Sequence, residues 1–195
     1  MTEIRSTMDM VMERLAQMDE ASPDTIDQDE YIRKGMRLAA GFLRGDTAGL
    51  QELLAECSEE EQPFVRKGAV RTLLRNIFLP REEEQREAAE KAMQGLLEVG
   101  QAMEGMGGMV NDMKSILDRY LQQREELKKQ LEEGFAQQME MMEANIAQQT
   151  GMSMKMDPSQ HPKFQEEWQR IQAEMNEQYG RAIDQYKAHI EQQIP

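Results

Sequence analysis

Two stretches decide the fold of this chain, ILDRYLQQREELKKQLEEGFAQQMEMMEANI at residues 116–146 and FQEEWQRIQAEMNEQYGRAIDQYKAHIEQQI at residues 164–194. In the first, apolar residues recur from Ile116 at spacings of 4, 4, 3, 4, 4, 4, 3 and 4, with one polar exception. The second shows the same spacings when it is read backwards from Ile194. Such spacings place side chains on one face of an α-helix. We therefore predict an antiparallel helical hairpin over residues 105–195.

The two apolar rows also predict a register for this hairpin. If they pair antiparallel, the numbers of facing residues sum to 310, so that Phe135 faces Met175 and the polar exception, Arg124, lies opposite Tyr186. The tip of the hairpin then lies near residue 155. The spacing repeats every eleven residues, which is close to the period of a straight helix, so we expect little supercoiling.

Residues 1–104 are predicted to form an N-terminal helical bundle. Helical apolar faces alternate there with turn and cap residues, and no stretch alternates with the period of two that is typical of a strand. Gly105, Gly107 and Gly108 are expected to break the chain, and we place the domain boundary there. The predicted fold class is therefore all-α, a bundle followed by a coiled-coil-like arm. The expected helices of the bundle cover residues 4–15, 28–44, 50–57, 58–78 and 82–104.

One helix start in the bundle has a recognisable sequence signal. Ser58 precedes Glu61 by three residues, which is the spacing of a capping box. In that motif the serine oxygen accepts from the third free N–H, and the glutamate reaches back to the serine N–H. Pro80 is expected to stop the helix that begins here.

Composition excludes several classes of protein. The chain has 23 Lys and Arg against 37 Asp and Glu, a net charge of -14, so it is a poor candidate for binding nucleic acid. A single cysteine excludes a disulfide framework and a thiolate zinc site. No apolar run approaches the roughly 20 residues of a membrane span. The first residues lack the apolar core of a signal peptide, so we expect a cytoplasmic protein.

No pattern in the sequence indicates an active site. Neither His161 nor His189 has a glutamate three residues before it, and no phosphate-binding loop or nucleophile motif is present. We expect both histidines at the surface and Cys57 as a buried, inert thiol. The prediction is a protein without catalytic residues, cofactor or bound metal. An enzyme would require a cleft that gathers carboxylates which the sequence does not show as a group.

The 18 methionines include two clusters that are candidates for binding a partner. A flexible, glycine-punctuated methionine surface can repack around varied apolar partners. Two alternatives stay open, since methionine also fills joins between helices and thioethers at the tip have a spacing that can hold Cu(I). The candidate residues are Met103, Met106, Met109 and Met113 near the glycine break, and Met152, Met154 and Met156 at the tip.

The opening residues resemble a known family. The segment Glu3-Ile4-Arg5-Ser6-Thr7-Met8-Asp9 and the helix after it are similar to the start of an uncharacterised family of small bacterial proteins. The resemblance implies no activity. It favours a bacterial cytosolic protein.

These observations lead to two functional hypotheses. The first is a non-enzymatic interaction or scaffolding protein that presents the hairpin to a protein partner, because a two-helix arm buries only one stripe per helix. Homodimerisation through the arm would cover its flanks. The alternative is a holdase-like chaperone or adaptor that grips apolar segments with its methionine surfaces.

Overall fold

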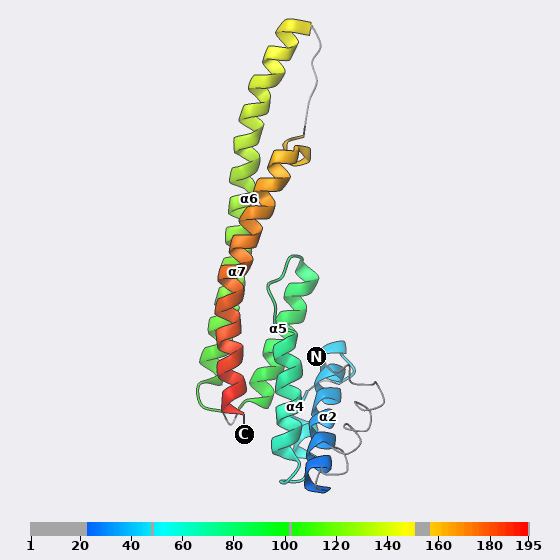
Figure 1. Cartoon of the computed structure of the whole chain (residues 1–195). Coiled ribbons are helices and arrows are strands. Elements are labelled where there is room, and N and C mark those ends of the chain that lie inside the picture. The colour runs from blue at the N-terminus through cyan, green and yellow to red at the C-terminus, as the bar shows by residue number, and fades with distance from the viewer. Residues whose placement is uncertain (1–22, 48, 102, 151–156, 195) are drawn as a thin grey trace, which may run out of the picture.

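The computed structural model describes residues 23–194 except for 48, 102 and 151–156, and over these residues the chain is all-α, as predicted. Six α-helices and one short 3₁₀ helix follow one another along it (Figure 1). The helix expected at residues 4–15 lies outside the described part. The elements are α2 (Pro23–Arg44), α3 (Gln51–Ala55), α4 (Gln62–Arg75), α5 (Glu83–Val99), α6 (Met106–Thr150), η1 (Pro158–Gln160) and α7 (Pro162–Gln193).

Helices α2 and α4 cross at very close range because each has a glycine at the crossing. A Cβ atom built on Gly35 of α2 would lie 1.9 Å from the carbonyl oxygen of Val65. A Cβ atom built on Gly68 of α4 would lie 2.0 Å from the carbonyl oxygen of Ile32. Any side chain at either position would therefore collide with backbone, so the two glycines fix where the helices cross.

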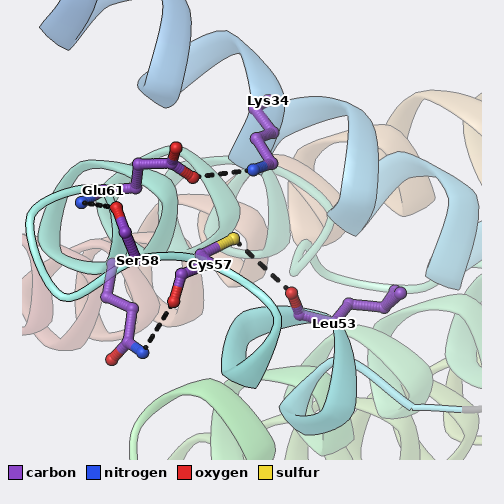
Figure 2. A network of polar contacts seen from close by, with 6 residues as sticks. Lys34, Leu53, Cys57, Ser58 and Glu61 are labelled. Atoms are coloured by element: carbon purple, nitrogen blue, oxygen red, sulfur yellow. Dashed lines mark hydrogen bonds and ion pairs between the residues drawn. The ribbon is translucent and has the colours of Figure 1, made fainter.

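Polar contacts hold the turn between α3 and α4 (Figure 2). Ser58 Oγ accepts a hydrogen bond from the Glu61 N–H at 3.3 Å, as one half of the predicted capping box requires, but this bond lies in the turn before α4, whose N-cap is Glu61. The other half is wrong, because the Glu61 carboxylate forms an ion pair with Lys34 of α2 at 2.8 Å. The hydrogen bond to Glu61 raises the pKa of the Lys34 ammonium. The turn is thus tied to α2.

The junction between α5 and α6 lies earlier in the chain than expected. Helix α5 ends at Val99, five residues before the predicted end of this helix at Glu104. Gly105 has a φ of 79°, a conformation that residues with a side chain rarely adopt. Gly107 and Gly108, which we expected to break the chain, lie inside the first turn of α6. One glycine with left-handed backbone is therefore sufficient to redirect the chain.

A continuous hydrophobic core joins the bundle to the base of the hairpin. Buried side chains from all six α-helices contribute to it, and it ends at Leu117 on α6 and at Ile183 on α7. The core therefore extends across the expected domain boundary between residues 104 and 105. The division of the chain into two domains stays a prediction.

Beyond this core the hairpin continues as a two-helix arm, which comprises residues 118–150 and 157–182. Figure 1 shows α6 running past the start of α7 at the far end of this arm. At about 1.5 Å per residue, the 45 residues of α6 span about 68 Å. The large hydrophobic side chains buried in the described part of the arm are Tyr120, Met139, Phe164 and Met175.

Candidate interaction site

Charged contacts anchor the base of the arm to helix α5, which packs antiparallel to α6. Arg86 of α5 lies 3.5 Å from Asp118 of α6, and Lys114 of α6 lies 3.8 Å from Glu90 of α5. These pairs are partly exposed, so each contributes little stability by itself. Together they set the side of α6 that faces the bundle, and thus the direction in which the arm leaves it.

Tyrosine hydroxyls connect the two helices of the arm. The Tyr120 hydroxyl donates to Asn176 Oδ1 at 2.9 Å, and the Tyr179 hydroxyl donates to Gln123 Oε1 at 2.5 Å. The two tyrosine rings meet edge to face with their centroids 5.6 Å apart. Such polar contacts are specific to one alignment of the helices, because each needs a donor and an acceptor at matching heights.

The predicted register of the hairpin is wrong by one repeat of the apolar pattern. Phe135 packs against Phe164, with ring centroids 5.6 Å apart, and not against Met175. In both this ring pair and the tyrosine pair the residue numbers sum to 299, eleven below the predicted sum. Because the apolar rows nearly repeat every eleven residues, they match in either alignment.

The polar residues are displaced in the same direction from their predicted partners. Arg124 does not lie opposite Tyr186, as we predicted; its guanidinium stands over the ring of Trp168, 5.9 Å from the centroid. Its Nη1 atom also donates to the backbone carbonyl of Arg81 at 3.2 Å, which links the arm to the loop before α5. The Tyr186 hydroxyl instead donates to Asp112 Oδ2 at 3.0 Å.

The start of α7 is defined by two side-chain caps. Asp157 accepts hydrogen bonds from the Ser159 hydroxyl at 2.8 Å and from the Ser159 N–H at 2.9 Å, and these bonds hold the pKa of its carboxyl below the usual range. His161 Nδ1 accepts from the Lys163 N–H at 3.2 Å. The His161 ring also packs on Phe135 with centroids 5.7 Å apart. Helix α7 therefore begins beside Phe135 of α6, well before the end of that helix at Thr150.

The last part of α6, residues 138–150, consequently extends past the start of α7, and we refer to it as the overhang. It is about 20 Å long. Its Met141 and Met142 side chains are 63% and 54% exposed. Among the described side chains, the other large hydrophobics with comparable exposure are Phe78 and Leu97 in the bundle. The overhang is therefore the place where the arm offers apolar surface to solvent.

The structure separates the methionines that the sequence grouped. Met106, Met109 and Met113 are buried in the core, and Met103 is partly buried against it. These four side chains pack the join between α5 and α6, and their role in binding a partner stays a prediction. The tip residues Met152, Met154 and Met156 lie outside the described residues, and so does the spacing that suggested Cu(I).

The exposed pair Met141 and Met142 was not singled out by the sequence, which predicted Met142 to face Trp168 across the hairpin. A usable signal was present: Asp157-Pro158 and His161-Pro162 both mark helix starts, since proline is favoured in a first turn. The predicted register concealed this signal, because an alignment in which facing residue numbers sum to 310 pairs the end of α6 with α7.

The bundle contains a free thiol, Cys57, and a shallow cleft. Cys57 is buried, as predicted, and its thiol donates to the Leu53 carbonyl at 3.5 Å (Figure 2). A cleft of about 270 Å³ lies between α3, α4 and the end of α5, and its charged residues are Arg66 and Glu98. The Arg66 Nε atom is buried without a hydrogen-bond partner in the described part of the chain. A guanidinium in that position can bind a small carboxylate by donating hydrogen bonds to it.

Within the residues that the structure describes, no group of three or more His, Cys, Asp or Glu side chains is placed to hold a metal ion. None of the described helices has the length and hydropathy needed to cross a membrane.

The fold and the overhang define a class of protein: an all-α bundle whose core continues into a projecting helical hairpin. The chain belongs to a family of unknown function, DUF6657, whose model matches residues 51–192. The chain thus belongs to an uncharacterised family over most of its length, whereas the match does not include the opening segment, whose resemblance stays a prediction. No curated protein and no solved structure matches the chain.

Proposed function

We propose that this protein is a non-enzymatic protein–protein interaction or scaffolding protein that presents its helical hairpin to a partner. The arm carries the proposal, because α6 continues from the end of the core at Leu117 to Thr150, and over residues 118–143 its only buried side chains are Tyr120 and Met139. A helical pair that buries so narrow a stripe gains little stability for its length. The length of the arm is therefore best explained by contact between its far end and a partner.

A capture experiment tests this function. The full chain is immobilised beside a variant in which residues 138–156 are replaced by a short glycine–serine turn, and both are exposed to an extract of the source cells. Because α7 begins near residue 137 of α6, this replacement shortens the arm and keeps both paired helices, although it removes the buried side chain of Met139. We expect a protein that the full chain retains and the variant does not. Equal retention by two variants of equal thermal stability would refute the proposal.

Homodimerisation through the flanks of the arm belongs to the same proposal. Within the paired part of the arm, several apolar side chains of α6 and α7 are only half-buried. A second arm packed over them would form a four-helix bundle. Sedimentation equilibrium tests this: we expect a dimer for the full chain, and a monomer at all concentrations would contradict it. The half-buried side chains include Leu127, Leu131, Trp168 and Ile171.

The exposure of Met141 and Met142 favours a second candidate, a holdase-like adaptor. Such a protein would bind many unfolded chains weakly through adaptable methionines. It would suppress the aggregation of an unrelated denatured protein at stoichiometric excess. Absence of suppression would remove this candidate and would leave the scaffolding proposal unaffected.

A further inference from the structure

The overhang continues a surface that is already an interface between helices. Along the paired part of the arm, the apolar face of α6 contacts α7, as the packing of Phe135 on Phe164 shows. Met139 and Met142 follow on the same row at the same spacings; Met139 is still buried, and Met142 is the first residue of the row that is more than half exposed. A helix that lies along the overhang would therefore occupy the position that an extension of α7 would take (Figure 1).

The side chains there suit an apolar helix of variable sequence. Met141 and Met142 are both more than half exposed on successive positions of α6, so they cover a broad strip of its surface. Methionine is unbranched and polarizable, and it adapts to partners of different shape. Amphipathic helices bind such surfaces through apolar residues at spacings of three and four.

Charge selects among the possible helices. From residue 130 to residue 154 the chain contains four glutamates and neither Lys nor Arg. Glu132 and Glu133 already face lysines one turn earlier, at 3.6 and 3.9 Å, but Glu140 is exposed on the overhang itself. A partner with lysines or arginines beside its apolar face would be attracted, whereas the overhang of a second copy would be repelled.

We infer that the overhang binds a basic amphipathic helix of a partner protein, with the apolar face of that helix on Met141 and Met142 and its cationic side chains beside the glutamates of α6. This inference rests on the proposed function and specifies the chemistry of the partner. It excludes a second copy of this chain as the occupant of the overhang.

Fluorescence anisotropy with two matched peptides tests the inference. The first is a labelled helix of about five turns with leucines on one face and lysines on the other, and the second has glutamate in place of every lysine. We expect the full chain to bind the lysine peptide at least about ten-fold more tightly than the glutamate peptide. Equal affinity for both peptides, or binding to neither, would overturn the inference.

Variants locate the binding. The double variant Met141→Gln/Met142→Gln removes the apolar strip and keeps the helix propensity, so we expect its dissociation constant for the lysine peptide to rise at least about ten-fold. Leu97→Gln is the matched control, because Leu97 is a comparably exposed residue on α5, in the bundle. An unchanged affinity in the double variant would show that only the net charge of the protein attracts the peptide.

Together with the capture experiment, the peptide measurements distinguish failure of this inference from failure of the proposed function. A partner that depends on residues 138–156, together with no preference for the lysine peptide, would overturn the inference and leave the function standing. If no captured protein depends on the overhang, the function itself fails.

Discussion

The bundle and the arm are both made of paired helices, but they are aligned by opposite means. In the bundle, α2 and α4 meet at Gly35 and Gly68, where backbone touches backbone and a side chain at either position would collide with it. In the arm, α6 and α7 present apolar rows that nearly repeat every eleven residues, and the tyrosine contacts decide between equivalent alignments. Close backbone packing specifies one alignment of two helices, whereas a periodic apolar row is compatible with several.

The largest expected effect is on the glycine crossing. Gly68→Ala places a Cβ atom about 2 Å from the Ile32 carbonyl oxygen, so the helices must separate along their whole contact. We expect a loss of about 3 kcal/mol or more in the free energy of unfolding, measured by urea denaturation.

Gly134→Ala in the arm is the control for this prediction. A Cβ atom there meets nothing within 4 Å, and alanine is favoured over glycine inside a helix. We expect a gain of about 0.5–1 kcal/mol. Similar losses in the two variants would show that the arm is packed as closely as the bundle.

The second prediction tests the register of the arm by fluorescence. Trp168 is the only tryptophan, so a bimane label on an introduced cysteine is quenched only when the label contacts it. In a Cys57→Ala background, we expect strong quenching from a label at Arg124→Cys and none from a label at Met142→Cys, eighteen residues further along α6. The reverse result would restore the alignment in which facing numbers sum to 310.

A smaller effect is expected from the hydroxyl that distinguishes the two alignments. Tyr120→Phe removes the hydrogen bond to Asn176 from an almost fully buried side chain. We expect a loss of about 1 kcal/mol in the free energy of unfolding. The same urea titration of Tyr31→Phe, at a partly exposed ring of the bundle, should show a smaller change. No loss in Tyr120→Phe would mean that the apolar rows alone set the register.

The smallest effect concerns alkaline pH. The hydrogen bond to Asp112 raises the pKa of the Tyr186 hydroxyl above its ordinary value of 10.0. A raised pKa in the folded state means that the contact stabilises the fold below the ordinary value and is lost as pH rises through the raised one. We expect the stability difference between the wild type and Tyr186→Phe to shrink above about pH 10. A difference that is constant with pH would contradict this assignment.

Periodicity predicted the class of the fold because helix type depends on local spacing alone. It could not predict the register, since the same spacing that identified the hairpin makes its alignments alike; that choice depends on which polar side chains meet, such as Tyr120 and Asn176. Composition likewise gave no role to Gly35 and Gly68, because a glycine inside a helix acquires its meaning only from the backbone that packs against it.

The candidate site was predicted by residue type but not by position. The site that we propose on the overhang also consists of methionines, but they are not the ones that the sequence grouped. The first cluster is buried because Met106, Met109 and Met113 lie on the face of α6 that enters the core. Exposure of Met141 and Met142 follows from where α7 begins. Burial is a tertiary property, so it could not be read from the cluster itself.

Helix α6 is continuous from the core to the overhang, and this gives the molecule the mechanics of a lever. About 17 Å of the helix, from Met106 to Leu117, is clamped in the core, and about 50 Å, from Leu117 to Thr150, projects beyond it. A sideways force on the free end acts about the rim of the core with roughly a three-fold mechanical advantage. Whatever docks at the far end therefore loads the methionine-packed join between α5 and α6, the part of the core with the most deformable side chains.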